Sequence, residues 1–170
     1  MKRRIIVIDT SILCCWLRIP GKETAGSGEF QWDFERVKKV IDSEVKKRST
    51  LVLPVATIIE TGNHIAQCSG DRFNLAQEFA NYLRLSANAE TPWAAFTEQL
   101  DLWSSEKLNN LANDWPNQAV QRRTIGDVTI NHVANWYSKA GYEVEILTGD
   151  AGLKAYEPKT PMLVPRRRQF

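Results

Sequence analysis

The feature that most constrains the fold is a series of short apolar runs with helix-like segments between them. The runs occupy residues 5–8, 51–55 and 144–147, and a weaker candidate occupies residues 162–164. They are rich in β-branched side chains, as is typical of strands buried on both faces of a parallel sheet. Because strands alternate with helices, the sequence predicts an α/β fold with a mostly parallel central sheet.

Helical periodicity fills the segments between these runs. Apolar residues recur at helix spacing over residues 34–45, behind Asp33, which is placed to cap a helix. A second helix should follow the second strand over residues 56–68, and a last one should cover residues 126–139. Extra helices are expected between residues 71 and 123, packed to one side of the sheet.

Within that insertion, Thr91-Pro92 predicts a helix start, because Thr can cap and Pro tolerates the first helical position. A stripe of large apolar residues follows at helical spacing: Trp93, Phe96, Leu100 and Trp103. This spacing favours a hydrophobic contact, within the chain or between subunits, over a surface that stacks nucleic-acid bases.

Length and composition indicate one compact domain over residues 1–170. A hydrophobic content of 43% and a charged content of 25% are ordinary for a globular chain with a core. The formal net charge of +2 permits a nucleic-acid partner without demanding one. The 3 cysteines fit neither a disulfide framework nor paired zinc ligands, so a reducing, cytoplasmic setting is expected, and no segment is expected to cross a membrane.

Acidic residues stand where the predicted strands end. Asp9 directly follows the first run, Glu60 lies about one helical turn beyond the second, and Asp150 comes three residues after the third. Asp127 opens the last long helix. Open parallel sheets bind ligands outside the carboxyl ends of their strands, so these side chains are expected to converge there.

Four carboxylates at one end of a sheet would repel each other by several kcal/mol per pair at an effective dielectric of about 20. A divalent cation such as Mg²⁺ or Mn²⁺, which prefers oxygen ligands, would stabilise the cluster. Such an ion can activate water for attack on a phosphodiester, which is nuclease chemistry. Taken singly, each acid also has a structural interpretation: Asp127 suits a helix N-terminus, and Asp150 could cap the next helix.

Four segments together resemble PIN domains: IIVIDTSIL, LPVATIIETG, TIGDVTINHVA and VEILTGDAGL. The resemblance implies a three-layer α/β/α sandwich, Mg²⁺ or Mn²⁺ as cofactor, and cleavage of RNA, with DNA left open as a substrate. It implies that Asp9, Glu60, Asp127 and Asp150 are catalytic metal ligands. It also implies that Ser11 and Thr148 orient them. The segment of residues 71–123 matches no particular PIN subfamily, and a homo-oligomer and an antitoxin-like partner both stay open.

Other residues have weaker claims on the site. Asn131, four residues after Asp127, is a candidate to hydrogen-bond a water on the ion, and His64, four residues after Glu60, is a candidate RNA contact. Arg122 and Arg123 precede the last long helix and could contact substrate phosphates, as could the arginines of residues 166–168. Each also has the ordinary interpretation of a solvated surface residue.

Three other functions compete with the nuclease. A phosphohydrolase with an Asp nucleophile also ends its first strand with Asp, but those similar to haloacid dehalogenases carry a second Asp two positions later, where this chain has Ser11. A receiver-like phosphate acceptor would leave Glu60 and Asp127 unexplained. A catalytically weak PIN-like module that binds RNA or serves as a scaffold need not keep all four acids.

Overall fold

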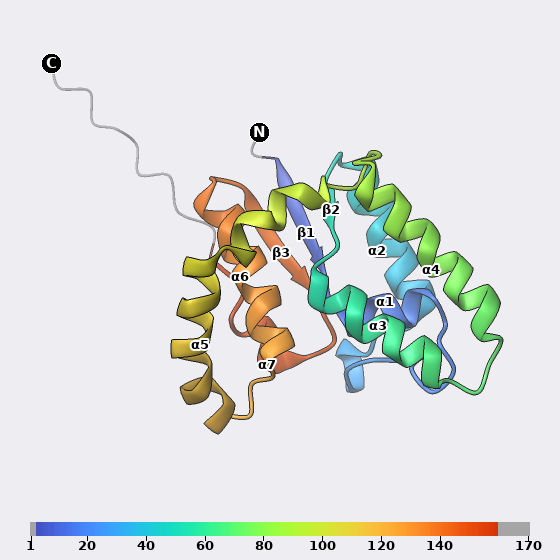
Figure 1. Cartoon of the computed structure of the whole chain (residues 1–170). Coiled ribbons are helices and arrows are strands. Elements are labelled where there is room, and N and C mark those ends of the chain that lie inside the picture. The colour runs from blue at the N-terminus through green and yellow to red at the C-terminus, as the bar shows by residue number, and fades with distance from the viewer. Residues whose placement is uncertain (1–2, 160–170) are drawn as a thin grey trace, which may run out of the picture.

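The computed structural model describes residues 3–159. Its strands form one three-stranded parallel sheet in the order β2-β1-β3, with helices around it (Figure 1). The elements follow in chain order: β1 (Arg4–Ile8), α1 (Thr10–Trp16), η1 (Gly28–Phe30), α2 (Phe34–Lys46), β2 (Thr50–Val52), α3 (Val55–Gln67), α4 (Arg72–Ala87), η2 (Phe96–Trp103), α5 (Ser105–Val120), α6 (Ile125–Lys139), β3 (Glu143–Leu147) and α7 (Ala151–Lys154). The elements η1 and η2 are 3-10 helices.

The central strand β1 directs side chains into two separate cores. Ile6 and Ile8 belong to a core that includes residues of α1, α2, α3 and α4, whereas Ile5 and Val7 belong to one built largely on α6 and β3. All four side chains are at most 2% exposed. Helices therefore cover both faces of the sheet, with α1–α4 on one side of it and α5 and α6 on the other (Figure 1). Within residues 3–159, every helix falls short of the length and apolarity needed to span a bilayer.

The predicted alternation of strands and helices is confirmed, and the first and third strands each begin one residue before the predicted run. The second strand ends at Val52, and Leu53 and Pro54 lead directly into α3. The last long helix begins at Ile125, one residue before the predicted start. The weak strand candidate at residues 162–164 lies outside the described residues, as do the arginines of residues 166–168.

The prediction of a helix start at Thr91-Pro92 is wrong. This cis peptide leads into a stretch that runs beside β2, where Leu51 N donates to Pro92 O at 2.8 Å and Ala94 N donates to Leu51 O at 2.8 Å. The order β2-β1-β3 makes β2 an edge strand, whose outward backbone groups need partners. The segment supplies those partners, and helical structure begins only at Phe96.

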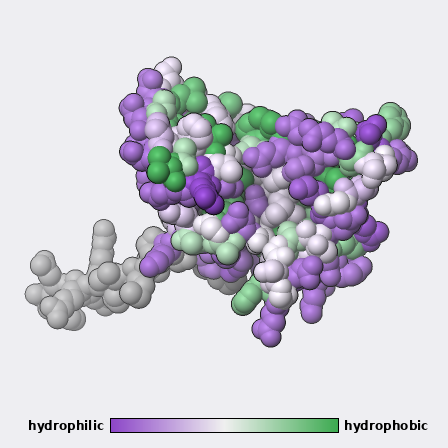
Figure 2. All heavy atoms as spheres, turned by 90° about the horizontal axis from the view of Figure 1, so that it is seen from below, coloured by the Kyte–Doolittle hydropathy of each residue, from purple (hydrophilic) through white to green (hydrophobic). Residues whose placement is uncertain are grey.

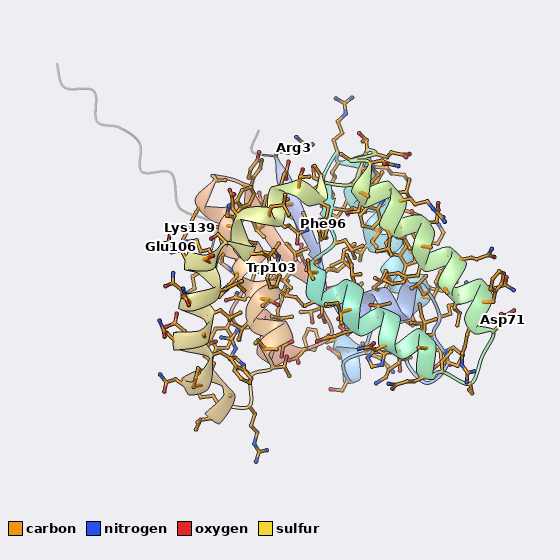
Figure 3. The ribbon with its side chains drawn as sticks, in the orientation of Figure 1. Arg3, Asp71, Phe96, Trp103, Glu106 and Lys139 are labelled. Carbon is orange, nitrogen blue, oxygen red and sulfur yellow. The ribbon has the colours of Figure 1, made fainter. Side chains whose placement is uncertain are left out.

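The large apolar residues of this segment consequently do not form one helical stripe. Trp93 is buried and stacks against Trp16, with ring centroids 6.3 Å apart, and the Tyr82 ring packs against it at a tilt, with its centroid 5.7 Å away. Leu100, by contrast, is 58% exposed. Trp103 lies at the end of η2 and, with residues of α5 and α6, lines a small hollow (Figure 3). The expected hydrophobic contact is confirmed for Trp93, as an internal one.

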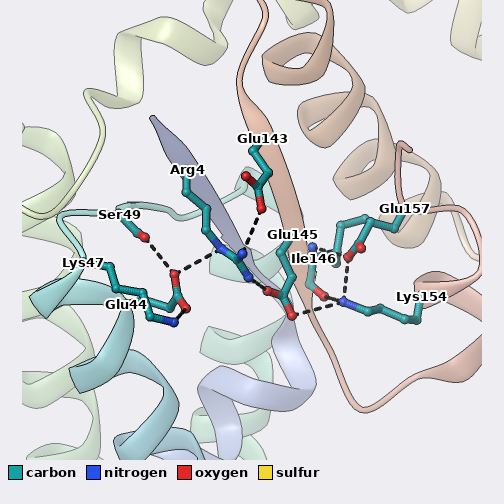
Figure 4. Close-up of polar contacts among 9 residues, drawn as sticks. All are labelled: Arg4, Glu44, Lys47, Ser49, Glu143, Glu145, Ile146, Lys154 and Glu157. Carbon is teal, nitrogen blue, oxygen red and sulfur yellow. Dashed lines mark hydrogen bonds and ion pairs between the residues drawn. The ribbon is translucent and has the colours of Figure 1, made fainter. Parts of the chain in front are cut away.

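Charged side chains join β1 to its surroundings. Arg4 forms ion pairs with Glu44 of α2 and with Glu143 and Glu145 of β3 (Figure 4). Lys154 of α7 continues the network to Glu145. Because Glu44 is only 5% exposed, its charge depends on these neighbours.

Candidate functional site

Asp9 is the centre of the polar contacts at the carboxyl end of the sheet. It follows β1 directly, caps α1 and is 5% exposed. Its Oδ2 accepts hydrogen bonds from Ser11 Oγ at 2.6 Å and from Thr148 Oγ1 at 2.8 Å. Thr148 follows β3, so the two hydroxyls expected to orient the acids both donate to Asp9, from two different strand ends.

Burial raises the pKa of the Asp9 carboxyl, while the hydrogen bonds from Ser11 and Thr148 act in the opposite direction. Hydrogen bonds therefore stabilise the charged form of Asp9, but they do not fully offset the hydration that the carboxylate loses on burial. A positive charge placed against this carboxylate would favour its ionised form.

Glu60 approaches Asp9 through the residue next to it. Glu60 lies on α3, half-buried, and its Oε2 accepts a hydrogen bond from Thr10 Oγ1 at 2.8 Å. On its other side it faces α6, because a Cβ built on Gly126 would overlap Glu60 Oε1. The Glu60 carboxylate is therefore held between the start of α1 and the start of α6.

Asp127 follows Gly126 in the first turn of α6, whose N-cap is Thr124. It is partly exposed, and its backbone N–H donates to Thr124 Oγ1 at 3.0 Å. The first turn of a helix favours an acidic side chain through the helix dipole, which was the structural interpretation of Asp127. Because the preceding residue, Gly126, lies against Glu60, Asp127 also lies at the edge of the sheet where Glu60 is found.

Asp150 is exposed and caps α7. Its Oδ1 accepts from Gly152 N at 2.6 Å and from Leu153 N at 3.1 Å, while its own N–H donates to Thr148 Oγ1 at 2.9 Å. The capping interpretation of Asp150 therefore holds in the structure. Through Thr148, the same residue is one hydrogen-bonded step from Asp9.

These contacts place the four acids around one end of the sheet, in two connected groups. One group runs from Asp9 through Thr148 to Asp150, and the other runs from Thr10 through Glu60 to Gly126 and the Asp127 turn. Figure 2 looks at the molecule from below, where hydrophilic residues cover most of the surface and hydrophobic ones lie between them. Among residues 3–159, no three His, Cys, Asp or Glu side chains lie close enough to hold a metal ion together.

The residues with weaker claims have mostly structural contacts. Asn131 donates to Tyr156 O at 2.5 Å and accepts from Asn135, so its amide fastens the chain after α7 instead of facing the acids. Arg123 lies over the Tyr156 ring, 3.6 Å from its centroid, so its guanidinium has an internal partner, and its role as a substrate phosphate contact stays a prediction. Arg122 is exposed, and His64 is half-buried on α3.

Sequence reasoning missed Thr10, Thr57 and Gly126. Thr10 positions Glu60, and Thr57 Oγ1 donates to Ile8 O at 2.8 Å, which fastens α3 to the last residue of β1. Gly126 allows the close approach of α6 to Glu60. The sequence carries a signal for each, since hydroxyl residues beside strand ends and a glycine in a first helical turn both suit close polar contacts, but it does not name their partners.

The fold and the site define an α/β protein with carboxylates and hydroxyls gathered at the carboxyl end of a small parallel sheet. Comparison with known protein families, with curated proteins and with solved structures found no match for this chain.

Proposed function

We propose that this chain is a PIN-like domain, a three-layer α/β/α sandwich that acts as a divalent-metal-dependent endoribonuclease. The observation that carries the proposal is Asp9, a buried carboxylate at the end of the central strand that accepts hydrogen bonds from Ser11 and Thr148. Burial raises the pKa of this carboxyl, and a cation bound at this edge of the sheet would favour its ionised form.

The donor set fits Mg²⁺ or Mn²⁺, because it consists of carboxylate and hydroxyl oxygens with no thiolate among them. Mg²⁺ usually binds through one or two carboxylates and keeps several waters, so a site without three convergent acids is compatible with it. Asp9, Glu60, Asp127 and Asp150 are the candidate ligands, of which one or two would contact the ion directly while the others hold its waters. When bound, such an ion activates a water and stabilises charge on a phosphodiester.

The chain's own residues prepare this site before any ion binds. Ser11 and Thr148 fix the orientation of the Asp9 carboxylate, and Thr10 fixes that of Glu60. Capping of α7 holds Asp150 in place through one of its oxygens. These donors are the kind of supporting contacts whose loss typically weakens a metal site by about 10- to 100-fold.

The proposal is tested by titrating Mg²⁺ and Mn²⁺ into the protein with a generic single-stranded RNA. We expect metal-dependent cleavage by the wild type and none above background by Asp9→Asn. Asp71→Asn is the matched control, because Asp71 also caps a helix, α4, at a distant part of the molecule (Figure 3). Equal cleavage by the wild type and Asp9→Asn would refute the assignment.

A second candidate is a PIN-like module that binds RNA without cleaving it. It is favoured by the lack of three convergent metal-binding side chains among residues 3–159. The same titration separates the two functions, because a binding module would retain RNA in both metal and chelator and leave its length unchanged.

A further inference from the structure

A cavity of about 420 Å³ adjoins the acidic edge and is not used by the proposed cleavage chemistry. One wall is the turn after β3, from Thr148 to Lys154, and the other is the loop before α2. The loop contributes Phe30 and Trp32, and the first turn of α2 contributes Arg36. Its volume falls within the roughly 300–1,000 Å³ typical of small-ligand sites.

The loop wall is built to hold a fixed shape. Ala25 and Trp32 form an antiparallel bridge, with Trp32 N donating to Ala25 O at 2.7 Å and Ala25 N donating to Trp32 O at 3.0 Å. The loop rests directly on the other wall, because a Cβ on Gly149 would overlap Ala25. This contact requires glycine at position 149 and fixes the position of one wall of the cavity relative to the other.

The side chains on this loop offer flat surfaces, and the start of α2 adds a positive charge. Phe30 is 77% exposed, and leaving so much apolar ring surface in water is unfavourable in free energy. Arg36 lies over the Trp32 ring, 4.4 Å from its centroid. Its guanidinium donates to the carbonyls of Glu29 and Gln31, so its charge has no carboxylate partner among residues 3–159.

We propose that this cavity is a subsite for one unstacked base of a single-stranded nucleic acid, with Phe30 as the stacking surface and Arg36 supplying positive charge. Aromatic rings and arginine planes are the groups on which bases of single strands stack. The wall formed by the turn after β3 fixes the place of the cavity on the substrate, because Thr148 and Asp150 belong both to this wall and to the acidic site. A base held here would flank the phosphate at the acids. The substrate class rests on the proposed function, whereas the stacking does not require cleavage.

The test measures equilibrium binding of a fluorescent single-stranded RNA to the full chain in chelator, where no metal-dependent cleavage occurs. We expect Phe30→Ala to weaken binding by about 5- to 150-fold, which corresponds to the loss of one base stack. Its thermal unfolding should match that of the wild type, because Phe30 is largely exposed. Phe73→Ala is the matched control, since Phe73 is 71% exposed and does not line the cavity, and it should bind as the wild type does.

Two further oligonucleotides test the base itself and its source. An RNA in which the base bound by the subsite is replaced by an abasic position should bind the wild type more weakly than the intact RNA does. Phe30→Ala should weaken the binding of this abasic RNA little further. DNA of the same sequence separates the two sources: equal affinity means that the subsite accepts either strand, and preferential binding of RNA means that the 2′-hydroxyl is also read.

The subsite and the nuclease can fail separately. If the wild type cleaves RNA while Phe30→Ala changes neither affinity nor cleavage position, the subsite is refuted and the nuclease stands. If Phe30→Ala weakens binding in chelator but no metal supports cleavage, the subsite stands and the nuclease fails. A wild type with no measurable affinity for any single strand, or an abasic strand that binds as tightly as the intact one, would also overturn the subsite.

Discussion

Replacement of Gly126 by Ala separates the positioning of Glu60 from ordinary helix stability. Ala inside a helix is normally more favourable than Gly by about 0.5–1 kcal/mol. At Gly126, however, the added methyl overlaps Glu60 Oε1, so the carboxylate must leave its place. The movement would break the hydrogen bond from Thr10, an interaction with a charged group that is worth about 1.5–3 kcal/mol.

The balance of these two effects gives a net destabilisation of about 0.5–2.5 kcal/mol for Gly126→Ala. Gly62→Ala is the control, because Gly62 lies within α3 and a Cβ there would meet only the Phe79 ring at 3.8 Å, an ordinary contact. It should stabilise the protein by about 0.5–1 kcal/mol. The two glycine replacements are therefore expected to differ in sign.

Urea unfolding in chelator measures both stabilities, and RNA cleavage with Mn²⁺ measures the effect on the proposed site. Gly126→Ala should lower cleavage by about 10- to 100-fold, as expected when a ligand loses its orientation, while Gly62→Ala should cleave normally. In a Glu60→Asp background, whose side chain is shorter, Gly126→Ala should cost less than it does alone. If Gly126→Ala were as stabilising as Gly62→Ala and equally active, Glu60 would not lie against α6 as described.

Three further substitutions test other parts of the structure. Asp150→Asn should keep its capping bonds, and its free energy of unfolding in chelator should stay within about 0.5 kcal/mol of the wild-type value. It should gain less thermal stability from Mg²⁺ or Mn²⁺ than the wild type does, and its RNA cleavage should fall by orders of magnitude. Normal cleavage would show that Asp150 is only a helix cap. Burial tends to raise the Glu44 pKa, but hydrogen bonds from Lys47 and Ser49 and the charge of Arg4 lower it below its ordinary 4.5. Glu44→Gln should therefore cost about 1–3 kcal/mol at pH 7, and the difference from the wild type should disappear as pH falls through the lowered pKa, whereas exposed Asp42→Asn should change little at any pH. Trp93→Ala should cost about 3–5 kcal/mol in denaturant unfolding, and a folded variant with weakened RNA binding would contradict its role in the core.

The sequence predicted the parts of the fold that local patterns determine. Residues 5–8 read as a strand buried on both faces because β1 is central, and its side chains do enter two cores. Residues 91–95 were wrongly predicted to begin a helix because their backbone partner, Leu51, lies about 40 residues away, and no local pattern indicates that pairing. In that segment, backbone hydrogen bonds to the edge strand β2 were favoured over the helix that the periodicity predicted.

Asp9, Glu60 and Asp150 were proposed because they follow strands, a relation that sequence order preserves, whereas Asp127 was proposed because it opens a helix. Their partners were found less completely: Ser11 and Thr148 came with the family resemblance, whereas Thr10 and Gly126 depend on the packing of α1 and α6 against α3. Asp150 shows why the two interpretations of a strand-end acid need not exclude each other. One oxygen can cap a helix, and the carboxylate still stands beside the site.

The central position of β1 explains why Asp9 organises this edge of the sheet. Both neighbouring strands run parallel to β1, so whatever follows each of them emerges beside Asp9. The chain after β3 supplies Thr148 directly, and the helix after β2 is fastened to the end of β1 by Thr57, which brings Glu60 within reach of Thr10. An acid at the end of either outer strand would have a strand on only one side and fewer donors to hold it. Asp9, the residue on which the proposed chemistry depends most, is therefore also the one whose position the sheet topology fixes most completely.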